Sequence, residues 1–350
     1  MAKAELISPR CNNFLLGQTE AEALFLRAWH SAAMHHAFIL HGPRGVGKAT
    51  LAFRIARFLL WADASKRANY QSLNVPENSD VFQQVASGSH PDLLVVERDY
   101  IETDRKKIIS ALRKGEVLEE DELASMKKSA FIRVDDIRKV NDFLSKTSFN
   151  DGWRIVVIDS ADDMNNNAAN ALLKILEEPP SKTIMLLISH NPALLLPTIR
   201  SRCAKLPCRT LKNGEVASLL RRYRSELSES QISKISDLSG GSIGTGVLYA
   251  DTHAEQIYAQ LCDILYAKER IDTEKLLSFC ADMAADVDKF GLLQDLILKF
   301  LKQNMPEAKD KDEIYSCFND TRRMFFDCVN VNMDKRAMLI ILLTKIGKAL

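Results

Sequence analysis

Short apolar runs alternate with helical stretches through the first 205 residues of the chain. Each run spans three to five residues, is continuously apolar and is often rich in β-branched side chains. Such runs are typical of strands that are covered on both faces of a parallel sheet. The expected strands are residues 38–40, 93–96, 155–158 and 184–188. Their alternation with helices over residues 13–205 predicts an α/β domain with a mostly parallel sheet.

Strand signals stop after about residue 206, and helical periodicity replaces them. Residues 219–238 have this periodicity and end at Gly240-Gly241-Ser242, and residues 254–350 look helical throughout. One apolar stripe is formed by Phe290, Leu293, Ile297, Phe300 and Leu301. We therefore expect three domains, namely the α/β domain over 1–205, a small helical unit over 206–253 and a helical domain over 254–350.

The last expected helix carries Met338, Ile341, Leu342 and Lys345. Asn332 or Asp334 would cap its first turn. Its apolar run over residues 338–343 is typical of a buried helix and is too short to span a membrane.

A charged stretch at residues 99–128 interrupts the α/β pattern. It is basic at first and then acidic, with Arg105, Lys106, Lys107, Arg113 and Lys114 followed by Glu119, Glu120, Asp121 and Glu122. We favour a solvated surface insertion over the alternative of a docking or DNA-facing arm.

Composition narrows the class of protein. The chain has 350 residues, 46% of them hydrophobic, and a formal net charge of +1, so any contact with DNA should be shared with partners or confined to a patch. Its seven cysteines are scattered and form no C-x-x-C pair, which favours reduced thiols and argues against a zinc ribbon. The start lacks an apolar signal core, and we expect a cytoplasmic protein with no membrane contact.

A phosphate-binding loop follows the first expected strand. Its residues are Gly42, Pro43, Arg44, Gly45, Val46, Gly47, Lys48, Ala49 and Thr50. They match G-x-x-x-x-G-K-[ST] except at Ala49, where the motif needs a hydroxyl to hold Mg²⁺. Thr50 is one residue late and would point about 100° away on a helix. The loop therefore predicts binding of ATP or ADP with weak Mg²⁺, against the alternative of an ordinary glycine-rich turn.

A carboxylate ends the expected strand at 155–158. In P-loop proteins an aspartate in the position of Asp159 supports Mg²⁺. Ser160 follows it, where ATP-hydrolysing members usually place a glutamate that orients water. A plain strand-end turn residue is the equal alternative for Asp159. Asp162 and Asp163 would cap the next helix.

Two later segments are the most specific. Residues 170–180 read Asn-Ala-Leu-Leu-Lys-Ile-Leu-Glu-Glu-Pro-Pro, a helix that the two prolines end, and residues 201–203 read Ser-Arg-Cys. Together they resemble the bacterial clamp-loader subunits of the AAA+ class. Residues 34–38, 89–92, 134–138 and 332–336 resemble the same family, so the resemblance covers nearly the whole chain.

The resemblance implies a ring of five subunits, each with an AAA+ P-loop module, a small helical lid (206–253) and a helical collar (254–350) that holds the ring together. Such a ring binds ATP between subunits, opens a sliding clamp and closes it around primed DNA. The implied partners are delta-type and gamma/tau-type subunits, the clamp and the DNA. Arg202 is placed as an arginine finger in the ATP site of a neighbour, where a guanidinium can stabilise transition-state charge. A surface arginine in a turn is the alternative.

The same resemblance places Lys174 toward the central chamber as a candidate contact to DNA phosphate, with a solvated lysine as the equal alternative. Glu177 and Glu178 would repel phosphate and are interpreted as helix-end structure. Cys203 is interpreted as core packing rather than a reactive thiol.

The chain departs from the ATP-hydrolysing members at Ala49, at Ser160 and at Thr245, where many members place an arginine that senses nucleotide. Residues 62–90 contain no cysteine, whereas many relatives carry a four-cysteine zinc module there, so we expect no zinc. We therefore predict a ring scaffold that donates a finger and has weak or no ATPase of its own. The alternatives are an ATP-hydrolysing motor subunit of the same ring and a stand-alone P-loop enzyme such as a nucleotide kinase, which would need no collar. No polymerase active site is visible, so any polymerase activity would belong to the assembly.

Overall fold

The computed structural model describes residues 8–31, 34–114, 122, 126–148, 152–267, 272–307, 310–331 and 333–350. The chain forms two compact units. Unit 1 consists of Met1–Glu215 and Gly241–Gly244, and unit 2 consists of Val216–Gly240 and Thr245–Leu350. The division into three domains at residues 205 and 253 stays a prediction.

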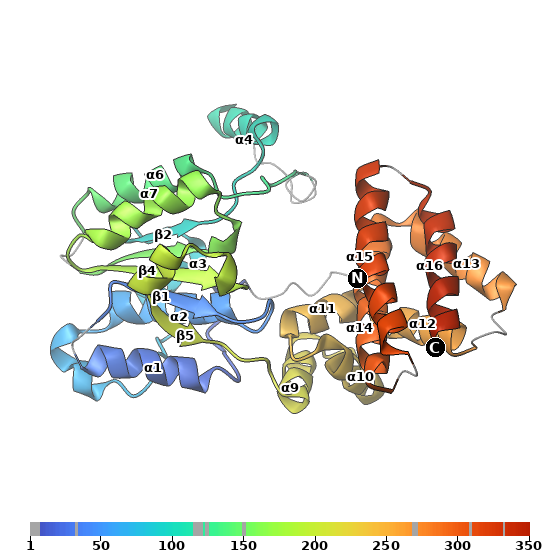
Figure 1. Cartoon of the computed structure of the whole chain (residues 1–350). Helices are drawn as coiled ribbons and strands as arrows, with labels where there is room; N and C mark the ends of the chain where they lie inside the picture. Colours follow the sequence, from blue (N-terminus) through green and yellow to red (C-terminus); the bar gives the residue numbers. More distant parts are fainter. Residues whose placement is uncertain are drawn as a thin grey trace. The chain divides into compact units, whose positions relative to one another are not determined.

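Within the described residues, unit 1 is built on a five-stranded parallel sheet with the order β2-β3-β4-β1-β5 (Figure 1). The strands are β1 (Ala37–His41), β2 (Leu93–Val96), β3 (Arg154–Ile158), β4 (Thr183–Ser189) and β5 (Ala204–Pro207). The first four agree with the predicted strands to within one residue at each end, so the parallel α/β prediction is confirmed.

The fifth strand, β5, was not predicted, because its four residues, Ala204 to Pro207, include a lysine and a proline and form no continuous apolar run. Among the strands that the structure describes, it pairs only with β1, at the edge of the sheet. An edge strand tolerates proline, since one side of it needs no ladder hydrogen bond.

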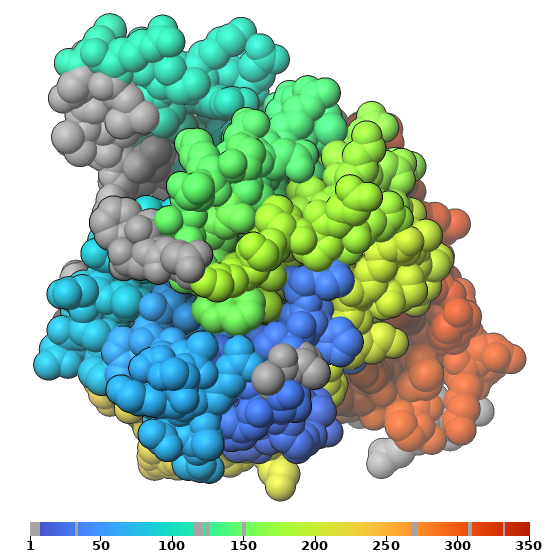
Figure 2. Space-filling model, turned by 90° about the vertical axis from the view of Figure 1, so that its left-hand side faces the viewer, coloured from blue at the N-terminus to red at the C-terminus, as the bar shows by residue number. Residues whose placement is uncertain are grey.

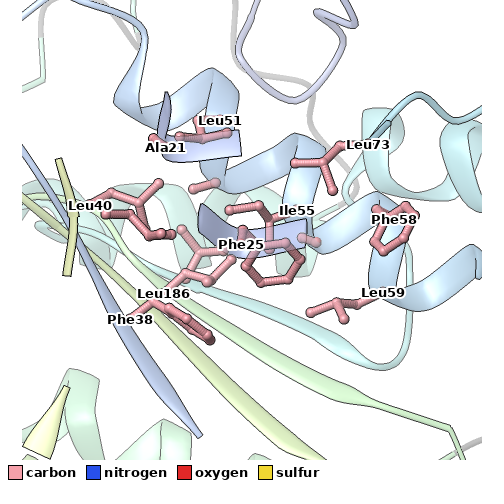
Figure 3. Packing of buried hydrophobic residues seen from close by; sticks show 14 of the residues in the cluster. Ala21, Phe25, Phe38, Leu40, Leu51, Ile55, Phe58, Leu59, Leu73 and Leu186 are labelled. Carbon is pink, nitrogen blue, oxygen red and sulfur yellow. The ribbon is translucent and has the colours of Figure 1, made fainter. Parts of the chain in front are cut away.

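Helices cover both faces of the sheet, and the strands bury side chains on each. One face packs against α1 (Thr19–His30), α2 (Lys48–Trp61) and α3 (Asp80–Ser87), and the other against α6 (Val134–Leu144), α7 (Asn166–Glu177) and α8 (Pro197–Arg202). Along β1, Phe38 and Leu40 join the first cluster and Ala37 and Ile39 the second, the two-residue alternation of a strand. Figure 3 shows Phe38 and Leu40 close to Phe25 of α1 and Ile55 of α2. Burial of these side chains is the main contribution to the stability of unit 1.

The charged insertion is anchored to this sheet by a short antiparallel stem. Ile101 N–H donates to the carbonyl of Lys127 at 2.9 Å, and Ser129 N–H donates to that of Asp99 at 2.7 Å. The stem carries α4 (Glu102–Lys114), which is mostly exposed and lies at the outer edge of unit 1 (Figures 1 and 2). The acidic residues 119–121 lie outside the described residues. The exposure of α4 agrees with a surface insertion, and its role stays a prediction.

Unit 2 is helical throughout its described residues. Its helices are α9 (Asn213–Tyr223) and α11 (Ile243–Asp251), which both begin in unit 1, α10 (Glu229–Ser239), α12 (Ala254–Tyr266), α13 (Thr273–Ala285), α14 (Val287–Asn304), α15 (Lys311–Val331) and α16 (Lys335–Ala349). All five residues of the predicted stripe on α14 are buried, which confirms that prediction. Gly240 ends α10 in the left-handed conformation that glycine adopts without strain.

The prediction for the last helix is partly wrong. Asp334 caps α16 by accepting from the N–H groups of Arg336 and Ala337, and Asn332 lies outside the described residues. Met338 and Leu342 are buried, but Ile341 is 62% exposed. The helix is therefore covered on one side only. None of the described helices combines the length and apolar character that a membrane span requires.

Candidate functional site

The predicted phosphate-binding loop joins β1 to α2, which begins at Lys48, so the strand, loop and helix that the motif requires are present. Gly47 precedes α2 with a φ of 100°. A side chain at Gly42 would clash with the carbonyl of Cys208, and one at Gly45, where φ is 71°, with the hydroxyl of Ser242. The loop fits its surroundings only as glycine at these two positions.

Lys48 is only 3% exposed and is turned onto the loop itself. Its ammonium donates to the carbonyl of Gly42 at 2.6 Å and to that of Pro43. Burial lowers the pKa of Lys48 to about 8, although the carboxylates of Asp162 and Asp159 act in the opposite direction. A polyphosphate would replace loop carbonyls with full negative charges as partners of this ammonium.

The position that should hold Mg²⁺ is apolar. Ala49 is half-buried, and its methyl packs against the cluster between α2 and the sheet. Thr50, the next residue, is buried. Among the residues that the structure describes, no group of three or more histidine, cysteine, aspartate or glutamate side chains is arranged to hold a metal ion. The expectations of weak Mg²⁺ binding and of no zinc stay predictions.

Asp159 directly follows β3, and its N–H donates to the carbonyl of Val96 at 2.8 Å. Burial raises the pKa of its carboxyl, and Glu97 adds to the shift, while Lys48 counteracts part of it. Asp159 and Lys48 thus lie within electrostatic reach of each other, as a nucleotide site requires.

Ser160, in the place of the usual glutamate, contacts a histidine. It has a φ of 60°, and its Oγ lies 3.1 Å from Nε2 of His190. Burial, together with Lys48 and Arg44, lowers the pKa of His190 to about 4, so the imidazole is neutral at pH 7. No carboxylate follows Asp159 directly to orient an attacking water.

Asp162 has a different place from the predicted one. It accepts from Ser189 Oγ at 2.7 Å, from Asn191 N–H at 3.1 Å and from His190 N–H, and so ties the segment after β3 to the end of β4. Asn165 caps α7 instead, accepting from the N–H of Ala168. The helix-cap prediction for Asp162 and Asp163 is therefore wrong, because the partners of Asp162 come from a strand 27 residues away.

Two further contacts, neither of them predicted from the sequence, support the loop. Gln18 is 2% exposed, and its side chain donates to the carbonyls of Val46 and Arg209 at 2.9 Å and accepts from the N–H of Arg209 at 3.0 Å. The N–H of Gly244 donates to the carbonyl of Gly45 at 3.0 Å. Both contacts join segments far apart in the sequence, and no local pattern signals them.

Arg202 ends α8, with its side chain 35% exposed. Ala204 lies opposite Phe38 in the parallel β1–β5 pair. Arg202 therefore lies at the end of the sheet where the strands begin. The phosphate-binding loop lies past His41, where β1 ends. The length of β1 separates these two ends of the sheet by about 13 Å. The structure therefore does not bring Arg202 to the loop of its own chain.

The family of this chain can be named from its similarity to known proteins. The sequence model of the protein family described as "DNA polymerase III, delta subunit" matches residues 17–212 of this chain. This chain belongs to that family. The resemblance that residues 170–180 and 201–203 predicted is confirmed at this level.

The relatives of this DNA polymerase III delta family member include subunits of two names. Subunit delta' of Pseudomonas aeruginosa is 34% identical over 223 residues, covering 63% of this chain and 57% of the relative. Subunit delta' of Bacillus subtilis is 30% identical over 179 residues, covering 51% of this chain and 44% of the relative. Subunit gamma/tau of Mycobacterium tuberculosis is 28% identical over 208 residues, covering 59% of this chain and 30% of the relative. The alignments thus span 57% of these relatives' lengths or less.

Three other predicted residues of this family member can be placed. Lys174 is exposed on α7. Cys203 is buried in the cluster formed with α7 and α8, and burial raises the pKa of its thiol to about 12, which confirms a packing role. Thr245 belongs to unit 2, and its part in nucleotide sensing stays a prediction.

Proposed function

We propose that this chain is a delta'-type subunit of a DNA polymerase III clamp loader, a ring scaffold that lends Arg202 to the ATP site of a neighbouring subunit and helps to load the sliding clamp onto primed DNA. Membership of the DNA polymerase III delta family supports the assignment to a clamp loader. The observation that carries the proposal is the place of Arg202, which is partly exposed at the end of the sheet opposite its own loop. An arginine so placed is out of reach of its own loop and is accessible to a site on another subunit.

The proposed partners are the delta-type and gamma/tau-type subunits of the loader, with the clamp and DNA reached through the complex. Lys174 is exposed on α7, as contact with a DNA phosphate requires, and is part of the proposal. A subunit of this type works on the chromosome, which places it in the cytoplasm. The assembly is tested by mixing the purified chain with these partners and measuring the mass of the resulting complex. A discrete hetero-oligomer is expected, and a monomer under all conditions would contradict the proposal.

The chain's own ATP site is proposed to turn over slowly or not at all. Ala49 offers no ligand to Mg²⁺, and Ser160 offers a hydroxyl to His190 instead of a carboxylate to water. The same ring with this chain as an active motor subunit is the alternative. The intact glycines and Lys48 support nucleotide binding, which both the motor alternative and a subunit without turnover would use.

Lys48→Ala separates the two readings. In a ring reconstituted with the variant, clamp-stimulated ATPase should stay within about twofold of the unmodified ring, because this site contributes little turnover. The matched control replaces the corresponding loop lysine of the gamma/tau-type subunit, which should remove most of the activity. A large loss with Lys48→Ala would establish the motor alternative.

Nucleotide binding should take up a proton at pH 8.5. The pKa of Lys48 in the empty loop is about 8, so the side chain is mostly neutral at that pH. Phosphates raise this pKa by favouring the charged form, and the uptake should reach about 0.7 proton per nucleotide and fall toward zero at pH 7. Calorimetry of Mg-ADP binding in buffers of different ionisation enthalpy measures it. Lys48→Arg is the control, since a guanidinium does not titrate in this range. Binding at pH 8.5 without proton uptake would show that Lys48 does not face the phosphates.

A further inference from the structure

Among the described residues, the side chain of Arg202 is held by contacts with its own helix, α8, and with the neighbouring helix α7. Nη2 lies 2.7 Å from Oε1 of Glu177, in the last turn of α7, and Nη1 donates to the carbonyl of Thr198 in α8 at 3.0 Å. A guanidinium has five N–H groups. These two bonds fix its plane and leave three N–H groups for another ligand.

Both helices are rigid supports for these contacts. Leu172 and Leu176 of α7 and Ile199 of α8 are buried in one apolar cluster. Pro179 and Pro180 follow α7 and restrict the backbone just after Glu177. The backbone that carries Glu177 is thus held at a fixed place beside α8, within reach of Arg202.

The ion pair is a poor device for stability. The side chain of Glu177 is 50% exposed, and an ion pair between side chains this accessible contributes little to folding. Glu177 also lies at the carboxyl end of α7, where the helix dipole disfavours negative charge. What the pair does accomplish is to select one orientation of a long, flexible side chain.

We propose that Glu177 is the positioning residue for Arg202: it holds the guanidinium ready for the triphosphate of the neighbouring subunit. This inference rests on the proposed function. A finger that is ordered before the neighbour arrives loses less rotamer freedom when it engages the phosphates. Its effect falls on the rate of the ATP reaction, since Glu177 itself touches no nucleotide.

The test is clamp-stimulated ATPase of the reconstituted ring with Glu177→Ala and Glu177→Gln, reading kcat and KM for ATP separately. We expect kcat to fall about fivefold with alanine and less with glutamine, which keeps one acceptor, while KM and the mass of the ring stay unchanged. Glu178→Ala is the matched control, because Glu178 is the adjacent exposed glutamate and is not paired with Arg202. It should behave as the unmodified chain.

Each other outcome has a distinct meaning. If Arg202→Ala abolishes activity and Glu177→Ala does not change it, the finger stands and the positioning role is wrong. If neither changes activity, the proposed function itself fails. A rise in KM or a loss of assembled ring with Glu177→Ala would assign the pair a structural role. A rise in kcat would show that Glu177 competes with the phosphates, which also overturns the proposal.

Discussion

Arg202→Ala should abolish ATP turnover by the assembled clamp loader and leave this chain folded. Loss of an arginine finger costs about 10³ to 10⁵ in rate, because nothing else carries its fixed charge to the γ-phosphate. Folding should survive, since the pair with Glu177 is solvent-accessible and contributes about 1 kcal/mol at most. The measurements are clamp-stimulated ATPase of the reconstituted ring and thermal unfolding of the isolated chain.

Arg221→Ala is the matched control. Arg221 is another exposed arginine paired with a glutamate, with Nη2 2.7 Å from Oε2 of Glu229, but it lies in unit 2. Its removal should leave turnover unchanged. Arg202→Lys should recover little activity, because an ammonium keeps the charge and loses the planar fork. ATPase near the unmodified level with Arg202→Ala would show that the finger assignment is wrong.

The second large effect is expected at Arg57, in the middle of α2. Its side chain is fully buried, donates to the carbonyls of Arg10 and Asn12 at 2.6 Å each, and stacks over the ring of Phe82 at 4.7 Å. Burial lowers its pKa to about 10, so the group is still charged at neutral pH. Arg57→Ala should lower the free energy of unfolding by about 3 to 5 kcal/mol, since it removes both hydrogen bonds and leaves a cavity behind. Urea unfolding measures the change.

Arg67→Ala is the control for Arg57→Ala. Arg67 also stacks on an aromatic ring, that of Trp29, at 4.7 Å, but it is only half-buried and its hydrogen bond to the carbonyl of Trp29 is 3.5 Å long. We expect a loss of about 1 kcal/mol or less. Equal losses for the two variants would mean that the hydrogen bonds of Arg57 to the carbonyls of Arg10 and Asn12 contribute little to stability.

How well the fold could be predicted depended on how local the signal is. The buried strands β1, β3 and β4 have both faces covered, so their central residues form continuous apolar runs that mark their positions. β5 pairs on one side only and has no such signature. The exposure of Ile341 shows a similar limit, because a run that is apolar all round predicts a helix but not which side is covered.

The candidate site divides in the same way. The loop from Gly42 to Thr50 could be predicted because phosphate binding requires these residue types at a fixed spacing, and Asp159 because it ends an apolar strand; their roles at a nucleotide stay predictions. Gln18 contacts residues at least 28 positions away, and Asp162 contacts a residue 27 positions away. Only the folded structure shows these contacts. No local pattern signals the Glu177–Arg202 pair, because the two residues are 25 positions apart and lie in different helices.

The segment Gly241–Gly244 belongs to unit 1, although the chain on both sides of it belongs to unit 2. The polypeptide therefore passes between the units three times, and no single cut yields two intact pieces. A fragment truncated after Glu215 would keep every strand of the sheet but lose the amide that caps the carbonyl of Gly45. Dissection of this protein into separately expressed modules would thus damage the nucleotide loop even though the loop itself is retained.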